Sequence, residues 1–542
     1  MKFSNPILRG FNPDPSFCRV GDDYYIATST FEWYPGVQIH HSRDLQNWEL
    51  VSRPLNRAEQ LDMRGNPDSC GVWAPSLSYA DGLFWLIYTN MRRYDGNFKD
   101  SPNYLVTAPA IDGPWSDRVY LNSSGFDPSL FHDDDGRKWL VNMRWDHRAT
   151  MKSPVDARDW FGGIDLQEYD HDQKKLVGAP KQIFHRSELG FTEAPHLMKR
   201  RGYYFLITAE GGTGYRHAVT HARSKSIEGP YELHPDSHVI TAKDTPENGV
   251  QRTGHGQAVD GPDDKTMLHT FLCSRPLEGK RSPLGREAGL TLLHWGDDDW
   301  LYREGGPAPE PATQADIVQP IEMLEFSGFD SAALPSQFQW LRSPEPDRLF
   351  SLTERPGWLR LFGRESIGSW FEQALVARRQ TEHVCAAAVT LDYEPGTYQE
   401  QAGLVAYYGR HQFHYLYVTA GPDGSPHLSI QSCNGDWPEG KLTFPIGDGV
   451  PVFANGLRLG MEVDGKDLQF FFATSEAPND WKKIGDVLDA SVLSDEGGRG
   501  EHANFTGCFL GVAAQDLTGH GKHADFDDFG YVTGKGLDGL NG

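Results

Sequence analysis

Short runs of β-branched and aromatic residues recur along the chain, separated by tight turn sequences such as GDD, ADG, DDDG and RRG. Polar and apolar positions alternate with a period of two in many of these runs, which is typical of antiparallel β-hairpins. Convincing amphipathic helices, with a period near 3.6, are absent throughout. The pattern therefore predicts an all-β protein.

One unit of this pattern recurs in the first half: a polar turn with a proline, a strand, a tight turn and an aromatic-rich return strand. The copies are NPDPSFCRVGDDYYIATS from Asn12, WAPSLSYADGLFWLIYT from Trp73, FDPSLFHDDDGRKWLVN from Phe126, EAPHLMKRRGYYFLIT from Glu193 and the weaker GHGQAVDGPDDKTMLHTFL from Gly254. The prolines at 15, 75, 128 and 195 are 60, 53 and 67 residues apart. About fifty to sixty residues are enough for a four-stranded blade, so five copies predict a five-bladed β-propeller. A β-sandwich with coincidental hairpins is the alternative, and the shared register of the prolines favours the propeller.

A change of composition marks the end of the repeats. Residues 303–320 are rich in Pro, Gly and Ala, as expected of a linker. Beyond them, strands such as LVAYYGRHQFHYLYV alternate again with a period of two. We therefore expect a propeller domain over residues 1–305, a linker over 306–325, and a β-sandwich domain over 326–542.

The register of the repeat places acidic residues at one site. The innermost strands of a propeller line a central channel, so equivalent positions converge there. The residue before the repeat proline is Asp14 in the first copy and Asp127 in the third. In the second and fourth copies Trp73 and Glu193 stand one residue earlier. We expect three carboxylates and one large aromatic side chain to face the same channel.

Three carboxylates in one channel repel one another, which separates their pKa values. Glycoside hydrolysis needs such a separation, because one carboxyl group must stay protonated while another stays ionised. An Asp before Pro on its own is more often a turn former that accepts backbone hydrogen bonds. The acids of the runs 133–135 and 297–299 are expected to lie in solvated hairpin tips.

The composition and the net charge limit the classes of ligand that the protein can bind. The 542 residues carry 75 acidic and 51 basic side chains, for a net charge of -24, and 12% of the residues are aromatic. Such a surface repels nucleic acid and anionic membranes but accepts a neutral ligand such as a sugar. The start of the chain has no apolar run typical of a signal peptide, and no stretch approaches the length of a membrane span. The six cysteines are scattered without a CxxC pair, so we expect reduced thiols and a cytoplasmic protein.

Several motifs together resemble one family. NPDPS, STFEWYPGV, WAPSL, GFDPSLF, TEAPH and TGHGQ are similar to those of the β-xylosidases of glycoside hydrolase family 43. In the second half, FTGCFLGVAAQDLTGHGKHADFDDFGY resembles the β-sandwich that accompanies the propeller in this subgroup. The resemblance implies an exo-acting, inverting xylan 1,4-β-xylosidase that removes xylose from the non-reducing end of xylo-oligosaccharides.

The resemblance also implies a role for each acid. Asp14 matches the general base that activates water, and Glu193 matches the general acid that protonates the leaving oxygen. Asp127 matches the acid that raises the pKa of Glu193 and orients it. An inverting mechanism requires the base and the acid to lie roughly 6.5–9.5 Å apart.

Six further residues match the substrate pocket of the family. Phe31 and Trp73 match aromatic residues that flank the terminal xylose, and Trp145 matches another aromatic of the pocket. Arg286 matches a guanidinium that binds sugar hydroxyls, and His255 a histidine near the base. Phe509 matches an aromatic of the sandwich domain that closes the pocket. From the residues alone, the aromatic side chains and His255 could equally belong to a hydrophobic core, and Arg286 to a surface ion pair.

Other activities stay open on the sequence. The nearest rival is an α-L-arabinofuranosidase, alone or as a second activity, because the two pentoses share hydroxyl geometry. A retaining fructosidase would carry a Glu-Cys-Pro motif where this chain has Glu193, Ala194 and Pro195. A non-catalytic sugar-binding propeller would not need three carboxylates. We expect no cofactor, although some relatives hold a cation through a histidine equivalent to His255. The family resemblance also implies a homo-oligomer, either a dimer or a tetramer.

Overall fold

The computed structural model describes residues 3–94, 98–308, 323–436, 438–452, 456–500 and 504–540. In these residues the regular structure is almost entirely β-strand, and the helical segments are short 3-10 turns. Two compact units are present, one of Met1–Leu61, Cys70–Arg275 and Arg286–Ile317, the other of Asp62–Ser69, Pro276–Gly285 and Val318–Gly542. The all-β prediction is confirmed. Most of the expected linker, residues 309–322, lies outside the described residues.

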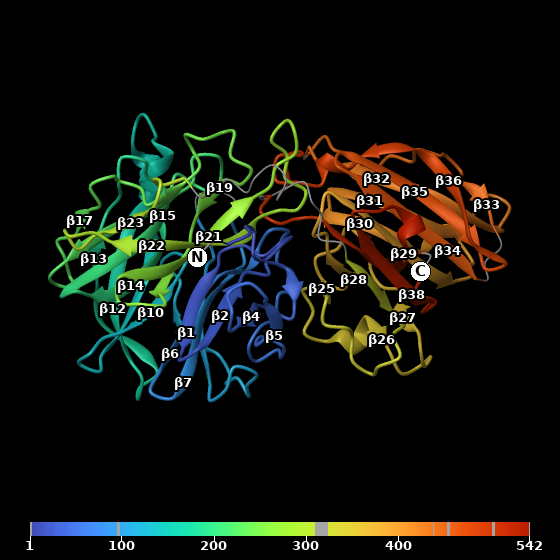
Figure 1. Cartoon of the computed structure of the whole chain (residues 1–542). Helices are drawn as coiled ribbons and strands as arrows, with labels where there is room; N and C mark the ends of the chain where they lie inside the picture. The colour runs from blue at the N-terminus through green and yellow to red at the C-terminus, as the bar shows by residue number, and fades with distance from the viewer. Residues whose placement is uncertain are drawn as a thin grey trace. The chain divides into compact units, whose positions relative to one another are not determined.

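The first unit consists of five separate antiparallel sheets, coloured blue to yellow-green in Figure 1. The first sheet contains β1 (Ser16–Val20), β2 (Asp23–Thr28), β4 (Gln38–Ser42) and β5 (Glu49–Ser52), with β3 (Trp33–Tyr34) between β2 and β4 in sequence. The second contains β6 (Gly71–Ala80), β7 (Leu83–Met91), β8 (Asn103–Ala108) and β9 (Val119–Asn122). The third contains β10 (Ser129–His132), β11 (Lys138–Trp145), β12 (Phe161–Asp170) and β13 (Lys175–Phe184).

The last two sheets have one additional short strand each. The fourth contains β14 (Glu193–Arg200), β15 (Tyr203–Glu210), β16 (Ala218–Ser224) and β17 (Glu232–Leu233), and β18 (Ile240–Thr241) also pairs with β16. The fifth contains β19 (Gln251–Gly254), β21 (Thr266–Ser274), β22 (Glu287–Trp295) and β23 (Leu301–Arg303), and β20 (Ala258–Asp260) pairs with β21. Two 3-10 helices, η1 (His147–Met151) and η2 (Ala157–Trp160), lie between β11 and β12.

The sheets contact one another in a closed ring. β1 contacts β6, β6 contacts β10, β10 contacts β14, β16 contacts β19, and β1 in turn contacts β20. Apolar side chains fill the space between neighbouring sheets: Phe17 and Ile26 of the first sheet pack with Leu268 and Leu290 of the fifth. Sheets packed in this way bury both of their faces against their neighbours. The prediction of a five-bladed propeller is confirmed, and each predicted repeat is the start of one blade.

The segment before β1 joins the first blade to the last. Leu8 forms a β-bridge with Ala288, and the buried Asn5 side chain donates to the Leu290 carbonyl at 3.0 Å and accepts from the Leu290 N–H at 2.8 Å. The Gly10 N–H donates to Glu287, whose carboxylate also pairs with Arg275 at 2.7 Å with both side chains fully buried. Contacts between residues about 280 positions apart therefore close the ring.

Not every turn acid is solvated as expected. Asp134 and Asp135 are exposed, but Asp133 is buried and accepts hydrogen bonds from Lys199 at 2.8 Å and from the Tyr204 hydroxyl at 2.9 Å. Both partners belong to the fourth blade, so Asp133 links two blades. The expectation that this residue is a free turn acid is wrong, because its long-range partners are invisible in a local pattern.

The second unit is a sandwich of two large antiparallel sheets, coloured yellow to red in Figure 1. One sheet contains, in spatial order, β25 (Phe338–Leu341), β28 (Ala374–Arg379), β37 (Phe509–Asp516), β30 (Glu400–Gly409), β31 (Gln412–Ala420), β32 (Pro426–Asn434) and β33 (Val450–Pro451). The other contains β26 (Phe350–Ser351), β27 (Leu359–Phe362), β38 (His523–Thr533), β29 (Val384–Asp392), β34 (Leu457–Asp464), β35 (Asp467–Thr474) and β36 (Ala477–Asp489), and β24 (Leu324–Ser327) pairs with β38. Three 3-10 helices complete the unit: η3 (Pro346–Arg348), η4 (Ala490–Val492) and η5 (Leu537–Leu540).

Two segments that precede the sandwich strands in sequence belong to this second unit. In one of them, Asp68 pairs with Arg342 at 2.6 Å and with Arg410 at 3.2 Å. In the other, Arg281 pairs with Asp489 at 3.2 Å. The sequence pattern placed both segments, Asp62–Ser69 and Pro276–Gly285, within the propeller range. Charged side chains bind them to the sandwich strands.

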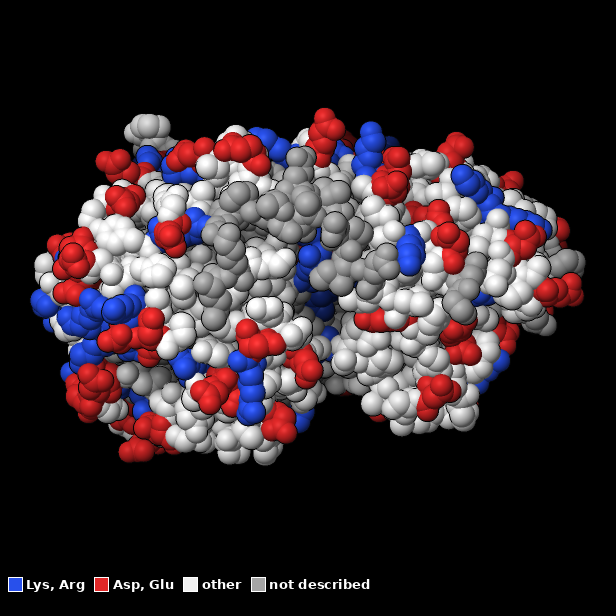
Figure 2. All heavy atoms as spheres, in the orientation of Figure 1, with Lys and Arg blue, Asp and Glu red and all other residues white. Residues whose placement is uncertain are grey.

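Charged side chains are scattered over the surface (Figure 2), whereas the cysteine side chains are buried. On the face drawn in Figure 2, acidic side chains occur in scattered groups with basic ones among them, in keeping with the net charge of -24. All six cysteines are buried with free thiols. Among the described residues there is no helix with the length and apolar character needed to cross a bilayer.

We predict that Asn5→Ala destabilises the first unit. The substitution leaves the N–H and C=O of Leu290 without the side chain that pairs with both, which costs about 2 kcal/mol. Urea denaturation followed by tryptophan fluorescence measures the change. Gln46→Ala, at an exposed position, is the control and should shift the free energy of unfolding by less than about 0.5 kcal/mol. Equal midpoints for the two variants would contradict the role of Asn5 in closing the ring.

Candidate active site

The five repeats share one unusual backbone feature. The register residues Asp14, Ala74, Asp127, Ala194 and His255 have positive φ angles of 57°, 36°, 54°, 51° and 36°. This conformation is rare for residues other than glycine and costs free energy, so it persists only where the surrounding structure imposes it. In the second and fourth blades the positive φ angle is accompanied by a register shift in the strand pairing. These shifts lie between Trp73 and Ser76 and between Glu193 and His196. The same turn therefore presents a side chain at the same place in every blade.

Asp14 lies in a network of hydrogen-bond donors. It is buried, accepts from the Ser29 hydroxyl at 2.7 Å and from Nη1 of Arg286 at 3.0 Å, and lies 3.6 Å from Nδ1 of His255. Burial alone would raise the pKa of Asp14, but Arg286, His255 and the Ser29 hydrogen bond together hold that pKa below its ordinary value. Asp14 is therefore ionised at neutral pH.

Asp127 and Glu193 have the opposite electrostatic environment. Burial and then the charge of Asp14 raise the pKa of Asp127, which accepts a hydrogen bond from the Ala194 N–H at 3.1 Å. Burial, then Asp127 and then Asp14 raise the pKa of Glu193 well above its ordinary value. The three carboxyl groups therefore interact electrostatically, as the repeat register predicted. Because Ala194 follows Glu193 directly, its hydrogen bond to Asp127 also restrains the backbone that carries Glu193.

A further buried acid supports the segment that leads to Glu193. Glu210, at the end of β15, accepts hydrogen bonds from the Thr192 hydroxyl at 2.9 Å and from the Ser187 N–H at 3.1 Å. Burial raises the pKa of Glu210 to about 7. The repeat pattern does not indicate Glu210, because this residue lies outside the register, at the end of the aromatic-rich strand YYFLITAE.

A cluster of aromatic rings lies next to Arg286, the partner of Asp14. The ring of Trp73 lies 5.7 Å from that of Phe31, 5.5 Å from Phe126 and 5.3 Å from Tyr94, measured between centroids. The guanidinium of Arg286 lies 5.2 Å from the Phe31 ring, so one arginine contacts both the aromatic wall and Asp14. The predicted residues Phe31, Trp73 and Arg286 therefore lie together.

Trp145 joins this wall through residues that the sequence did not indicate. The ammonium of Lys99 lies 4.2 Å from the Trp145 ring and 3.7 Å from the Tyr94 ring, in cation–π geometry. Tyr94 also interacts with Glu193: burial first, and then the charge of Glu193, raise the pKa of Tyr94 to about 12. Tyr94 and Lys99 lie in a loop between β7 and β8 without a recognisable motif, and only the fold brings them to the site.

His255 and the nearby His217 are buried and neutral. Burial lowers the pKa of His255 despite the opposing effect of Asp14, and it lowers the pKa of His217 to about 3. Of the groups that lower the pKa of Asp14, Arg286 has the largest effect, ahead of His255. Among the described residues there is no group of three or more His, Cys, Asp or Glu side chains placed to hold a metal ion. The expectation that no cofactor is required stays a prediction.

Phe509 belongs to the second unit. It is the first residue of β37, its side chain is fully buried, and the Arg379 guanidinium lies 5.1 Å from its ring centroid. The expectation that Phe509 closes the substrate pocket stays a prediction.

Comparison with known proteins gives consistent matches along the chain. The family model described as "Glycosyl hydrolases family 43" matches residues 3–301, and the one described as "Beta xylosidase C-terminal Concanavalin A-like domain" matches residues 327–532. The chain is 56% identical to "Xylosidase/arabinosidase 43B" of Humicola insolens, with 97% of each chain covered. It is 45% identical to "Beta-xylosidase" of Bacillus subtilis (strain 168), with 98% of this chain and 99% of that one covered. The solved structure of xylan beta-1,4-xylosidase from Bacillus Halodurans C-125 superposes with a TM-score of 0.91 at 46% identity, covering 98% of this chain and 100% of the other.

We predict that Glu193→Gln stabilises the folded chain more at high pH than at low pH. A carboxyl group whose pKa is raised by folding stabilises the folded state when protonated, and this stability is lost as the pH rises above the unfolded pKa of about 4.3. The Gln side chain keeps the shape of Glu but cannot ionise. The melting temperature of the variant should therefore exceed that of the wild type at about pH 8 and approach it at about pH 4.5.

Differential scanning calorimetry at both pH values measures this difference. Glu247→Gln, an exposed carboxylate, is the control and should show no pH-dependent difference. A constant difference between Glu193→Gln and the wild type at both pH values would contradict a raised pKa for Glu193.

Proposed function

This chain belongs to glycosyl hydrolase family 43, and on that premise we propose that it is an exo-acting, inverting β-xylosidase. It removes β-linked xylose from the non-reducing end of xylo-oligosaccharides. The observation that carries the proposal is the electrostatic division of the buried carboxyl groups: Asp14 is held ionised beside Arg286, while Glu193 is held protonated. The choice of xylose is supported by the relatives, which are named as xylosidases.

In the proposed mechanism the protonated Glu193 donates a proton and the ionised Asp14 accepts one. Glu193 donates its proton to the glycosidic oxygen as the bond between that oxygen and the anomeric carbon breaks. Asp14 accepts a proton from the water that attacks the anomeric carbon from the opposite face, so the configuration inverts. The proton then passes from Asp14 to solvent, and Glu193 is reprotonated from solvent. The 6.5–9.5 Å separation that this mechanism requires stays a prediction.

Asp127 is proposed as a positioning residue. Its charge raises the pKa of Glu193, and its hydrogen bond to the Ala194 N–H restrains the backbone next to the acid. Arg286, held between Asp14 and the Phe31 ring, has donors suited to neighbouring hydroxyls of a pentose. Trp73 and Phe31 supply apolar faces for the sugar ring.

An α-L-arabinofuranosidase activity of the same pocket is the second candidate. It is favoured by one observation, the name "Xylosidase/arabinosidase 43B" of the relative at 56% identity. A homo-oligomeric state, which rests on the family resemblance, and a cytoplasmic location, which rests on the sequence, are further parts of the proposal.

The proposed activity is tested with the p-nitrophenyl glycosides of β-D-xylopyranose and α-L-arabinofuranose. We expect a higher kcat/KM on the xyloside, and Glu193→Ala should lower the turnover of xylobiose by about 10²–10⁴-fold. NMR of early xylobiose digests should show the α-anomer of xylose appearing first. A faster arabinoside rate would overturn the substrate assignment, and early release of the β-anomer would overturn the inverting mechanism.

We predict that Asp127→Asn moves the high-pH limb of the kcat/KM profile to lower pH. Activity is lost at high pH when Glu193 loses its proton, and the substitution removes a negative charge that raises the pKa of Glu193. The Asn carbonyl can still accept the hydrogen bond from Ala194. A pH profile on p-nitrophenyl β-xyloside measures the change, with the exposed Asp135→Asn as the control. An unshifted limb at a reduced rate would show that Asp127 acts only through position.

A further inference from the structure

The second unit contains a sheet with two chemically different faces. Along β30, β31, β32 and β37, one set of alternate residues is apolar and lies in the sandwich core: Leu404, Leu416, Ile430 and Val512. The opposite face carries polar side chains at cross-strand positions: Gln401 pairs with Gln515, and Tyr417 pairs with Ser429. A sheet face that only met bulk solvent would expose such residues, but all four are buried. Their burial shows that they form the floor of a groove.

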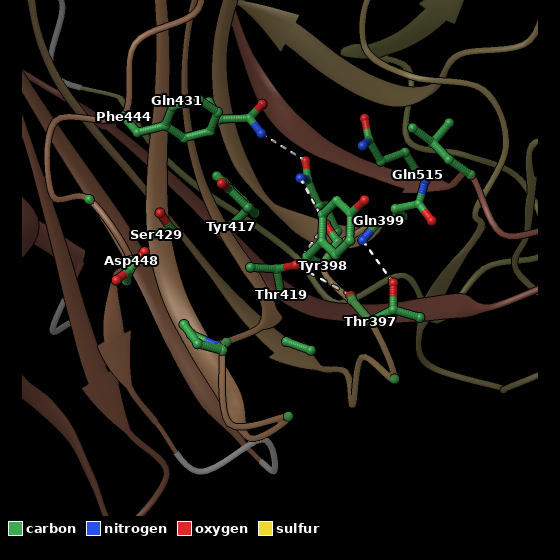
Figure 3. Close-up of a pocket in the computed structure, with 18 residues that line it drawn as sticks. Thr397, Tyr398, Gln399, Tyr417, Thr419, Ser429, Gln431, Phe444, Asp448 and Gln515 are labelled. Carbon is green, nitrogen blue, oxygen red and sulfur yellow. Dashed lines mark hydrogen bonds between the residues drawn. The ribbon is translucent and has the colours of Figure 1, made fainter.

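The groove has a cavity of about 940 Å³. Figure 3 shows its floor, from which Tyr417, Ser429 and Gln431 project, and its walls. Thr397, Tyr398 and Gln399 form one wall, from the segment before β30, and Phe444 and Asp448 come from the segment between β32 and β33. This volume lies in the upper part of the range of about 300–1,000 Å³ seen for ligand sites.

The floor is suited to hydroxyl groups. Nε2 of Gln431 donates to Oε1 of Gln401 at 3.1 Å, and the Thr419 hydroxyl donates to the Tyr398 carbonyl at 3.1 Å. Each side-chain amide has a further donor or acceptor position, and the Tyr417 and Ser429 hydroxyls can both donate and accept. Among the described residues that line the cavity there is no Lys or Arg, and the one acid, Asp448, is exposed. The groove therefore favours a neutral ligand rich in hydroxyls over an anion or a cation.

The rim is apolar and accessible. Tyr398 is 71% exposed, Phe444 is 50% exposed and Leu517 is 48% exposed. Large apolar side chains gathered beside a cavity mark a binding site more often than an inert surface. Flat rings above a polar floor suit a sugar ring, which has an apolar C–H face and a polar hydroxyl edge. An apolar protein segment would cover the remaining donor and acceptor positions of the buried amides without pairing them, which is costly.

We propose that this groove, hereafter the sandwich groove, is a second carbohydrate site that binds a short segment of a neutral xylo-oligosaccharide. The identity of the sugar rests on the proposed function, but the preference for a neutral saccharide rests on the groove itself. The site lies in the second unit and contains none of the residues assigned to catalysis. It holds an oligosaccharide without cleaving it, because the described lining residues include a single carboxylate, the exposed Asp448.

The proposal is tested by isothermal titration calorimetry with xylotetraose. Glu193→Gln is the background, so that the ligand is not hydrolysed. This variant should bind two ligands per chain. Adding Tyr398→Ala and Phe444→Ala should weaken one of the two sites by about tenfold or more, since both ring faces are removed. Adding Phe371→Ala instead, an aromatic of the same unit that is 54% exposed and lies outside the groove, should change neither site.

A second measurement separates this proposal from the proposed function. In the Glu193-containing protein, Tyr398→Ala with Phe444→Ala should leave kcat/KM on p-nitrophenyl β-xyloside unchanged. One binding site in the Glu193→Gln background, or two sites that the groove substitutions do not affect, would overturn the sandwich groove as a carbohydrate site.

If the wild type hydrolyses no pentoside, the proposed function fails and the groove is tested with neutral cello-, manno- and arabino-oligosaccharides. Binding of one of these that is lost with the groove substitutions supports a saccharide site and overturns the assignment to xylose. Binding of none overturns the site.

Discussion

The burial of three carboxyl groups that interact electrostatically is the constraint on which the rest of the first unit depends. Buried like charges cannot all be ionised, because each raises the free energy of the others. One cation, Arg286, donates a hydrogen bond to Asp14 and is the largest influence that lowers its pKa, whereas its effect on the pKa of Asp127 and of Glu193 is smaller than those of burial and the neighbouring carboxylates. The asymmetric placement of one guanidinium therefore decides which carboxyl group is ionised and which is protonated.

The propeller holds these charges in place against their repulsion. Each blade carries a residue with positive φ at the same position, and the ring is closed by contacts between the segment around Asn5 and β22. Neither feature is favourable locally: the turns are strained, and the closing contacts join residues far apart in sequence. The apolar layers between neighbouring sheets provide the free energy that keeps both. The packing of the blades therefore holds the strained turns in place, and these turns in turn fix the positions of the acids.

The second unit uses a β-sheet differently. Its strands alternate between core residues such as Leu416 and polar residues such as Tyr417, so the sheet has an apolar and a polar face. In the propeller both faces of each sheet are covered by neighbouring blades, and the three acids lie at the start of the inner strands. The sandwich leaves one face available for a groove. Two β-architectures in one chain thus offer two distinct kinds of surface to a carbohydrate.

The sequence by itself determined the five blades, the sandwich and the three acids, because hairpin turns, period-two alternation and the repeat register are local properties that survive without knowledge of contacts. It also indicated Trp73, whose position follows the same register. Only the tertiary structure decided the partners: Arg286 is 272 residues from Asp14, Lys99 joins Trp145 to Tyr94, and Glu210 supports Thr192. The sequence pattern likewise did not predict that Asp133 is buried or that Asp62–Ser69 belongs to the second unit. Electrostatic and hydrogen-bond partners are chosen by distance in space, and a local pattern contains no information about that distance.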